Sequence, residues 1–373
     1  MSRLRVLQVN KLYSPHIGGI EKIVQNIAEG LKDKLDIKVL VCQEKGRGAN
    51  EVINGVEVIR SGSLGLYASM PLSPGFPLLL NRLSRDRDIL HFHMPFPLGD
   101  LSYLFMKPKN KKIVVSWHSD IIRQQFWLKY YRSFLYKFLN LADKILVAAP
   151  ANIEFSPFLK EFREKCMVIP YGIDDSPFQS KDMPEKIENI RNQYGGGPLL
   201  LFVGRLVYYK GLEYLIRAMG QVNARLLVIG HGPLLEQHKA LVHKTGLEKR
   251  VFFLGEIDQE DMPLYYEACD IFVLPSSANS EAFGLVQLEA MACARPVINT
   301  LLPTGITFAS LDRQTGITVP PLNSGALANA IKELLADEGL RKEYGYNARK
   351  RFQHYFTRDK MLNNILRLYE GLF

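Results

Sequence analysis

The chain alternates short apolar runs with amphipathic segments of helical period, and this alternation constrains its fold more than any other feature. The first apolar run covers residues 4–9 and is followed, after Gly18 and Gly19, by a predicted helix at 20–32. Further strands are predicted at 37–42, 56–59, 88–92, 113–116, 144–147 and 167–169. Strands that alternate with helices form mostly parallel sheets covered on both faces, so we expect an α/β fold.

The pattern breaks over residues 171–197, which are polar and rich in glycine and proline, and we interpret this stretch as an interdomain linker and the entry to a second domain. It restarts with a strand at 199–203 and a helix at 211–219, followed by strands at 226–229, 251–254, 271–274 and 297–299. Residues 324–373 are predicted to be helical throughout. We therefore expect Rossmann-like domains at 1–175 and 176–355, and a final helix at 356–373 that packs back on the first domain.

Composition restricts the compartment and the partners. Four scattered cysteines without a CxxC pair argue against a disulfide framework or a zinc site and favour a reducing compartment. The N-terminus has no signal-peptide pattern, and no apolar run reaches the roughly 20 residues that span a bilayer, so a cytoplasmic protein is expected. The net charge of +9 suggests an anionic partner such as a phosphorylated ligand, a nucleic acid or an acidic membrane face.

The segment 280–290 carries the strongest chemical signal. Glu281 and Glu289 are eight positions apart at the start of a predicted helix, which would put them on roughly the same face. The amides of residues 283–286 would point at whatever lies before the helix, and such a terminus favours a phosphate. Glu289 lies among apolar neighbours, where a carboxylate could hold ribose hydroxyls. The alternative is that Glu281 caps the helix and Glu289 is a solvated surface charge.

This segment resembles the EX7E motif of the large retaining GT-B glycosyltransferase family called family 4. Other segments match the family in the same order: 15–21 as its glycine loop, 203–206 with Lys210 and Gly211 as its phosphate-binding pair, and 230–233 and 253–255 as further signatures. The resemblance covers nearly the whole chain. It implies a GT-B fold, with two Rossmann-like domains facing a deep cleft that holds a nucleotide sugar.

The resemblance also implies roles for individual residues. Arg205 and Lys210 would stabilise the charge that grows on the departing diphosphate, and Gly18 and Gly19 would let the backbone approach it. Without the resemblance, surface solvation and an ordinary strand-to-helix turn would explain these four residues. The predicted catalytic set is His118, Arg205, Lys210 and Glu281, and the predicted donor-binding set is Gly18, Gly19, Gly204, Gly230, His231, Leu254, Ala282, Phe283, Gly284, Leu285 and Glu289.

Histidines follow or end two predicted strands. By resemblance, His118 contacts hydroxyls of the donor sugar; the alternative is a structural histidine paired with Asp120. His91 and His93 have a spacing that could suggest a metal, but only the distant Asp100 could complete a site, so His93, with His16, is placed on the acceptor side. We therefore predict no metal site and no cofactor.

No carboxylate is placed as a nucleophile like that of retaining glycoside hydrolases. The resemblance instead implies front-side attack in which the departing phosphate takes the proton of the acceptor. Glu281 would then orient hydroxyls of the sugar, and arginine and lysine would do the electrostatic work of a metal.

Residues 117–124 and 299–305 resemble the mannosyl- and rhamnosyltransferases of bacterial O-antigen and capsule assembly, which favours GDP-mannose or GDP-rhamnose as the donor. UDP-sugars are the main rival. Residues 121–140 combine seven aromatic side chains with four basic ones, Arg123, Lys129, Arg132 and Lys137. A basic aromatic helix is typical of an anionic membrane interface, which predicts a lipid-linked acceptor such as an undecaprenyl-diphosphate-linked glycan and a peripheral position on the inner membrane. The alternative is that the aromatic side chains face the domain core and the basic ones are solvated.

Three other classes fit less well. A nucleotide-sugar epimerase can share the two-domain fold, but the EX7E pattern favours a transferase. A nicotinamide oxidoreductase would need GxGxxG in the first loop, which is lacking. A basic nucleic-acid or membrane-binding module would leave the set Arg205, Lys210, Glu281 and Glu289 without a role, so no nucleic-acid partner is predicted.

Overall fold

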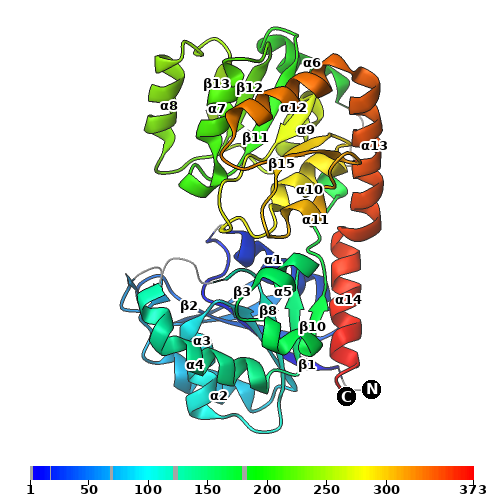
Figure 1. Ribbon diagram of the computed structural model, residues 1–373. Coiled ribbons are helices and arrows are strands. Elements are labelled where there is room, and N and C mark those ends of the chain that lie inside the picture. Colours follow the sequence, from blue (N-terminus) through cyan, green and yellow to red (C-terminus); the bar gives the residue numbers. More distant parts are fainter. Residues whose placement is uncertain (1–2, 17, 68–69, 121–124, 179–182) are drawn as a thin grey trace. The chain divides into compact units, whose positions relative to one another are not determined.

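The computed structural model describes residues 3–16, 18–67, 70–120, 125–178 and 183–373. The chain divides into two compact units, each with its own mostly parallel sheet (Figure 1). Unit 1 comprises Met1–Tyr171 and Arg358–Phe373, and unit 2 comprises Gly172–Thr357. The predicted α/β class with two Rossmann-like domains is confirmed.

Unit 1 contains a sheet of eight strands in the order β10-β9-β8-β7-β1-β2-β4-β3. The strands are β1 Arg5–Val9, β2 Asp36–Cys42, β3 Ala49–Ile53, β4 Val56–Ser61, β7 Ile89–Met94, β8 Lys112–Trp117, β9 Lys144–Val147 and β10 Cys166–Val168. All neighbours pair in parallel except β3, which runs antiparallel to β4. The short strands β5 (Leu66–Tyr67) and β6 (Met70–Pro71) form a separate hairpin. Strands β3, β5 and β6 were not predicted, because Asn50 and Glu51 interrupt β3, and β5 and β6 have only two residues each.

The two faces of this sheet differ in chemistry, because successive side chains of a strand point to opposite faces. On one face, Leu7, Phe92 and Val115 belong to a buried core that includes residues of helices α2, α3 and α4. The opposite face carries polar side chains such as Gln8 and His91, which contact helix α14. The helices of unit 1 are α1 Gly19–Leu31, α2 Phe76–Ser84, α3 Pro97–Met106, α4 Gln125–Leu141, α5 Pro150–Phe155 and α14 Arg358–Glu370.

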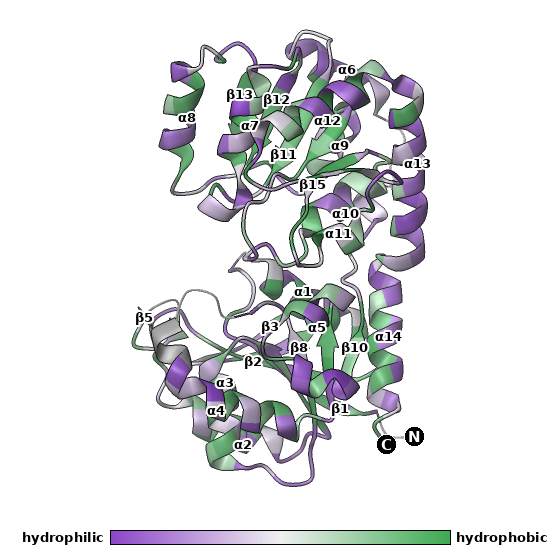
Figure 2. Cartoon of the chain, in the orientation of Figure 1, coloured by the Kyte–Doolittle hydropathy of each residue, from purple (hydrophilic) through white to green (hydrophobic). Residues whose placement is uncertain are grey.

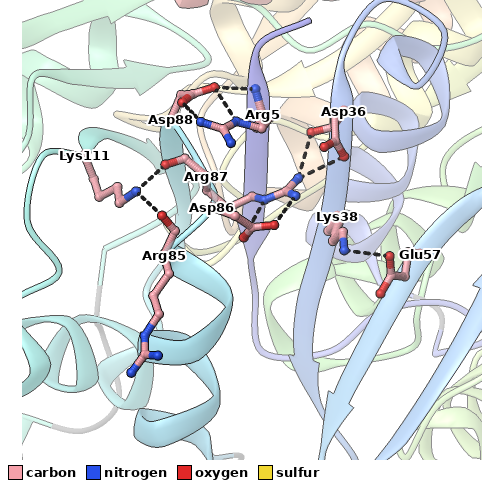
Figure 3. A network of polar contacts seen from close by, with 9 residues as sticks. All are labelled: Arg5, Asp36, Lys38, Glu57, Arg85, Asp86, Arg87, Asp88 and Lys111. Atoms are coloured by element: carbon pink, nitrogen blue, oxygen red, sulfur yellow. Dashed lines mark hydrogen bonds and ion pairs between the residues drawn. The ribbon is translucent and has the colours of Figure 1, made fainter.

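A network of ion pairs joins the amino ends of the central strands of unit 1 (Figure 3). Arg5 at the start of β1 pairs with Asp88 at 2.7 Å, and the Arg87 guanidinium lies 2.9 Å from Asp36 at the start of β2. Lys111, just before β8, donates to the carbonyl oxygens of Arg85 and Arg87. Ligands of such sheets bind beyond the carboxyl ends of the strands, so these charges stabilise the fold rather than form the site.

Unit 2 contains a sheet of six parallel strands in the order β13-β12-β11-β14-β15-β16. The strands are β11 Leu199–Val203, β12 Arg225–Ile229, β13 Val251–Gly255, β14 Ile271–Val273, β15 Val297–Thr300 and β16 Gly316–Val319. The helices are α6 Pro184–Gln193, α7 Leu212–Met219, α8 Leu235–Lys244, α9 Met262–Ala268, α10 Leu285–Ala292, α11 Ile306–Ala309, α12 Ser324–Ala336 and α13 Glu338–Tyr355. Its strands are among the most continuously hydrophobic segments of the chain (Figure 2), as expected of strands covered on both faces. Strand β16 was not predicted.

Two irregular regions differ in detail from the sequence pattern. Residues 324–373 are not one continuous helix, because α12 ends at Ala336 and the side chain of Asp337 caps α13 by accepting from the amide of Leu340 at 2.9 Å. The stretch 171–197 is not only a linker. It contains α6, in which Arg191 pairs with Asp270 at 3.3 Å within unit 2.

Helix α14 is the last element of the chain, yet it packs in unit 1. A Cβ added to Gly30 of α1 would lie 2.3 Å from Leu362 Cδ1, so α1 and α14 are in close contact. Among the described residues, no helix is long and apolar enough to cross a membrane.

Candidate active site

Lys210 and Glu281 form a buried ion pair at the carboxyl edge of the unit 2 sheet. Lys210 Nζ lies 2.5 Å from Glu281 Oε2, and each side chain is 10% exposed. The Ser276 hydroxyl also donates to Glu281 Oε2, at 3.3 Å. Lys210 ends the short helix that follows β11, and Glu281 lies in the segment between β14 and α10. Parallel strands β11 and β14 are neighbours, which brings these two predicted catalytic residues together.

Tight glycine turns hold this edge in shape. Gly211 directly follows Lys210 with φ 67°, and a Cβ there would meet the carbonyl oxygen of Pro275 at 2.0 Å. Gly230, after β12, has φ 127°, and a Cβ there would meet the carbonyl oxygen of Gly204 at 2.2 Å. Only glycine fits such positive φ angles at so close an approach. The predicted donor-binding residues Gly204 and Gly230 are therefore packed against each other.

Further predicted donor-binding residues lie along the same edge. The amide of Gly230 donates to the carbonyl of Gly255 at 2.6 Å, next to half-buried Leu254 in β13. The amide of Leu206 donates to the carbonyl of His231 at 3.0 Å, which joins the loop after β11 to the loop after β12. The side chains of Arg205 and His231 are both exposed. The structure thus presents one arginine and one histidine to solvent beside the buried Lys210.

The EX7E segment is not a single helix, contrary to expectation. Helix α10 begins at Leu285, after Gly284 with φ 72°, so Glu281 precedes the helix and does not share a face with Glu289. The Glu289 carboxylate accepts from the Tyr266 hydroxyl at 2.7 Å, so it is not simply a solvated surface charge. Phe283 is buried, and the carbonyl of half-buried Ala282 accepts from the amide of Gly305 at 2.8 Å.

The N-cap residue of α10 is Gly284, which has no side chain that could accept a hydrogen bond from the amides at the start of the helix. The partial positive charge of a helix N-terminus favours an anion. The start of α10, the Lys210 ammonium and the carboxylate of Glu289 are therefore the groups of unit 2 suited to a phosphorylated ribose compound.

The glycine loop of unit 1 forms the start of α1. Gly18 is the N-cap and Gly19 the first helical residue, and the carbonyl of Gly18 accepts from the amide of Lys22 at 3.0 Å. A Cβ on Gly18 would lie 2.2 Å from a carboxylate oxygen of Glu21. Ile17, within the predicted loop, lies outside the described residues. His16 is exposed, with Nδ1 2.6 Å from Glu44 Oε1.

His118 is buried and both of its ring nitrogens have partners. Nδ1 lies 2.6 Å from the Tyr171 hydroxyl, and Nε2 lies 2.9 Å from His93 Nδ1. The alternative that Asp120 satisfies His118 is wrong. Asp120 Oδ1 instead accepts from Trp117 Nε1 at 2.9 Å and from the Ser156 hydroxyl at 2.6 Å.

The contacts of His118 continue into a buried network across the polar face of the sheet. His93 Nε2 lies 2.5 Å from Gln8 Oε1, and Gln8 Nε2 donates to the Tyr369 hydroxyl at 2.9 Å. The same hydroxyl lies 2.6 Å from Nδ1 of His91. His93 is 1% exposed and His91 is 0% exposed, so both are part of this network rather than of a surface. The expected position of His93 against an acceptor does not match this burial.

The network has one consistent proton arrangement. An amide oxygen only accepts, so His93 donates from Nε2, and its Nδ1 then accepts from His118 Nε2. The remaining nitrogen of His118, Nδ1, must accept from the hydroxyl of Tyr171. Burial lowers the pKa of His91 and of His118 to about 3, and holds the pKa of His93 well below its usual value. All three rings are therefore neutral at physiological pH.

Asp100, considered as a distant metal ligand, has a different partner. Its carboxylate accepts from the Tyr131 hydroxyl, and burial raises its pKa well above the usual value. In the described ranges, no group of three or more His, Cys, Asp or Glu side chains could hold a metal ion.

Helix α4 divides its side chains between the core and solvent. Lys129, Arg132 and Lys137 are exposed, while Arg123 lies outside the described residues. Tyr130 is 63% exposed and Phe134 40%, whereas the helix buries Leu135 and Phe138 completely. Some aromatic side chains of this segment therefore enter the core, as the alternative expected, and others are exposed beside the basic ones.

Several residues of these clusters had no signal in the sequence. Ser276 and Tyr266 lie outside the motifs and the predicted strands, and Tyr369 is 361 positions from its partner Gln8. No short motif contains partners so distant, so only the fold reveals them.

Two family models match the chain. The family described as "Glycosyl transferases group 1" matches residues 184–351, and "Glycosyltransferase Family 4" matches residues 17–176. The chain is 32% identical to the O-antigen chain mannosyltransferase C of Escherichia coli over 99% of each chain. It is 33% identical to the D-rhamnosyltransferase WbpZ of Pseudomonas aeruginosa, over 95% of this chain and 92% of that protein.

Solved structures resemble the whole chain at lower identity. A sucrose-phosphate synthase from Thermosynechococcus elongatus has a TM-score of 0.81 at 23% identity, covering 100% of this chain and 99% of that one. Anabaena HepE, solved in complex with UDP, has a TM-score of 0.80 at 20% identity, covering 99% of this chain and 100% of that one. At such identities the likeness establishes the shared fold.

Proposed function

The chain belongs to family 4 of the GT-B glycosyltransferases, and we propose that it transfers mannose or D-rhamnose from a GDP-sugar to a glycan, with retention of configuration. The glycan is part of a bacterial surface polysaccharide, O-antigen or capsule. The observation that carries the proposal is the buried pair of Lys210 and Glu281, with Nζ 2.5 Å from Oε2. Glu281 lies shortly before Leu285, where α10 begins.

The chemistry assigned to unit 2 is stabilisation of a leaving group. As the bond from the anomeric carbon to the diphosphate breaks, negative charge grows on the phosphate oxygens. Lys210 and the exposed Arg205 supply positive charge, and the N-terminus of α10 supplies a partial charge of the same sign. Glu289, which the Tyr266 hydroxyl orients at 2.7 Å, accepts from ribose hydroxyls.

The acceptor oxygen forms its bond to the anomeric carbon on the face that the diphosphate leaves, and its proton goes to a departing phosphate oxygen. Glu281 orients hydroxyls of the sugar and holds the Lys210 ammonium in place. Protein cations do the electrostatic work, so no divalent metal or other cofactor is required. His118 as a contact of the donor sugar stays a prediction; with both ring nitrogens engaged, it would need its main chain or a rearranged ring for that contact.

The nature of the donor rests on relatives. One relative over nearly the full chain is named as an O-antigen mannosyltransferase and another as a D-rhamnosyltransferase. A third, 27% identical, is named as a GDP-mannose-dependent mannosyltransferase. These names favour a GDP-sugar. A UDP-sugar is the first alternative, and a nucleotide-sugar epimerase is the second.

A thermal-shift screen against GDP-, UDP- and dTDP-sugars tests the choice of donor, because a ligand that binds only the native state raises its apparent stability. At a ligand concentration 100 times its dissociation constant, the gain is about 2.7 kcal/mol. We expect the largest shift with GDP-mannose or GDP-rhamnose. A larger shift with UDP-sugars would contradict the GDP proposal and leave the glycosyltransferase assignment intact.

Two controls separate the remaining alternatives. The protein incubated with the nucleotide sugar that it binds, but without an acceptor, should form no new nucleotide sugar. An epimerase would form one. Transfer should also persist in the presence of EDTA, and its loss would contradict the metal-free mechanism.

We further propose that the acceptor is lipid-linked, with an undecaprenyl-diphosphate-linked glycan as the first candidate, and that the enzyme works at the cytoplasmic face of the inner membrane. Support comes from α4, which exposes Lys129, Arg132 and Lys137 beside Tyr130 and Phe134. Basic and aromatic side chains together favour an anionic lipid interface.

A further inference from the structure

Residues 61–81 contain no charged side chain, although 23% of the residues of the chain are charged. Arg60 precedes this segment and Arg82 follows it. The run of 21 residues is the longest uncharged stretch of the sequence, and the Rossmann-like fold does not require it, because most of it is neither a buried strand nor a buried helix.

The first half of this segment forms a hairpin that exposes its apolar side chains. The backbone bonds from Leu64 N to Leu72 O, at 2.8 Å, and from Leu72 N to Gly65 O, at 2.9 Å, close its base. Leu64 is 73% exposed, Leu66 47%, Tyr67 66% and Leu72 50%. Scattered surface leucines are ordinary, but an uncharged hairpin with this many exposed apolar side chains marks an interaction surface.

Basic side chains lie at the base of the same hairpin. Gly46 and Ser63 exchange two backbone hydrogen bonds of 2.8 Å, so Lys45 and Arg47, which flank Gly46, are held next to the hairpin. Both side chains are exposed. The acidic residues closest in sequence are paired elsewhere: Glu44 with His16 and Glu51 with Arg60. The hairpin therefore combines exposed apolar side chains with exposed basic side chains that lie next to Ser63.

The charge of the chain is concentrated in the unit that carries this hairpin. Unit 1 contains 28 Lys and Arg against 17 Asp and Glu, a net charge of +11. Unit 2 contains 19 against 21, a net charge of −2, so the two sum to the +9 of the whole chain. An anionic partner is therefore attracted by unit 1 and not by unit 2.

We propose that the hairpin is a membrane anchor: Leu64, Leu66, Tyr67 and Leu72 insert into the interface of an anionic lipid bilayer while Lys45 and Arg47 contact headgroup phosphates. Apolar insertion combined with electrostatic attraction is how peripheral proteins hold to anionic lipid. The inference rests on the proposed lipid-linked acceptor and adds a second contact to that of α4. A purely apolar partner would not account for the basic charge of unit 1.

The first test measures sedimentation with phosphatidylglycerol and phosphatidylcholine vesicles. The triple variant Leu64→Ser, Leu66→Ser, Leu72→Ser should bind phosphatidylglycerol vesicles about tenfold more weakly than wild type or worse. The control Val52→Ser changes a residue that is 72% exposed on neighbouring β3 and should bind as wild type does. Equal binding by the triple variant and wild type would overturn the proposal.

The second test measures insertion directly. Tryptophan emission of Leu66→Trp should shift to shorter wavelength with phosphatidylglycerol vesicles, and that of Val52→Trp should not; native tryptophan emission is subtracted as background. An equal response of both variants would overturn insertion by the hairpin. The proposal would also be overturned if gel filtration showed that wild type is a dimer and the triple variant is a monomer. The hairpin would then contact a second copy of the chain.

Donor turnover without vesicles separates this inference from the proposed function. The triple variant should transfer sugar to a soluble acceptor at the wild-type rate. Failure of wild type to bind any vesicle, with normal turnover, would remove the membrane contacts and leave the transferase in place. Absence of turnover in wild type with every GDP- and UDP-sugar would instead contradict the proposed function.

Discussion

Lys210 Nζ and Glu281 Oε2 lie 2.5 Å apart, and both side chains are about nine-tenths buried. The pair lies among glycine turns that leave little room for rearrangement, since a Cβ at Gly211 would meet a backbone oxygen at 2.0 Å. A buried charge at this position is stable only beside a charge of opposite sign, because a single ion in a site of low dielectric constant is energetically costly.

This dependence predicts a non-additive effect on stability. Lys210→Met or Glu281→Gln alone should lower the free energy of unfolding by about 3–5 kcal/mol, because each leaves one buried charge without its partner. The double variant should lose clearly less than the sum. Urea unfolding of the four proteins of the cycle measures this, and additive losses would show that the two side chains do not depend on each other.

The same two residues should be essential for turnover. We expect Lys210→Ala and Glu281→Gln each to lower kcat by about 100- to 1,000-fold, the loss typical when one group that stabilises transition-state charge is removed. Lys239→Ala, an exposed lysine paired with Glu236 at 2.9 Å, is the matched control and should keep wild-type activity. Circular dichroism checks that the variants are folded at the assay temperature, and near-normal kcat in either variant would remove that residue from the mechanism.

The buried histidines predict how stability depends on pH. Burial lowers the pKa of His91 and of His118 to about 3, so the native state stays neutral while the unfolded chain binds protons below about pH 6.5. The contribution of these histidines to the free energy of unfolding is therefore fully present above pH 6.5. It decreases as the pH falls toward 3, by about 1.4 kcal/mol per pH unit for each histidine. Urea midpoints from pH 7 to 5 should show this slope, and His91→Gln should reduce it. A slope unchanged in that variant would mean that other groups cause it.

The hydrogen-bond network predicts the tautomers of two histidines. With Gln8 Oε1 at 2.5 Å from His93 Nε2, both His93 and His118 should carry their proton on Nε2. Two-bond nitrogen–proton correlations on protein labelled with ¹⁵N-histidine distinguish the tautomers, and Gln8→Leu should alter the signals of both rings. Finding the proton on Nδ1 of His118 would mean that the Gln8 amide is reversed.

The basic side chains of α4 predict a contribution to lipid binding. Replacement of Lys129, Arg132 and Lys137 by serine should weaken binding to anionic vesicles by roughly 100-fold, from about 1 kcal/mol for each charge, and leave donor binding unchanged. The matched control replaces Lys239, Lys244 and Lys249, three exposed lysines of unit 2. Unchanged sedimentation of the α4 variant would exclude this helix from the interface.

Much of the fold followed from periodicity, since buried parallel strands such as β9 and β11 are continuous apolar runs with the predicted bounds. The edge strand β3 was missed because Asn50 and Glu51 interrupt its apolar residues, so no continuous apolar run marks it. The break at Asp337 was missed because a cap inside a long helical pattern depends on one side chain.

The site was predictable where its chemistry is local. Lys210 and Glu281 belong to short motifs, and the neighbouring strands β11 and β14 bring them together. The environment of His118 was not predictable, because Tyr171 is 53 positions away and Gln8 reaches it only through His93. Asp120, which is close in sequence and was considered as the alternative partner of His118, has other partners.

Helix α14 completes unit 1 with residues that are translated after the whole of unit 2, because unit 2 lies between the two parts of unit 1 in the sequence. During synthesis, unit 2 can therefore fold as an uninterrupted segment while the first 171 residues still lack the helix that covers Gln8 and His91. A nascent or prematurely terminated chain would expose that polar, histidine-lined face. Proteolysis of stalled chains should then remove the N-terminal part first.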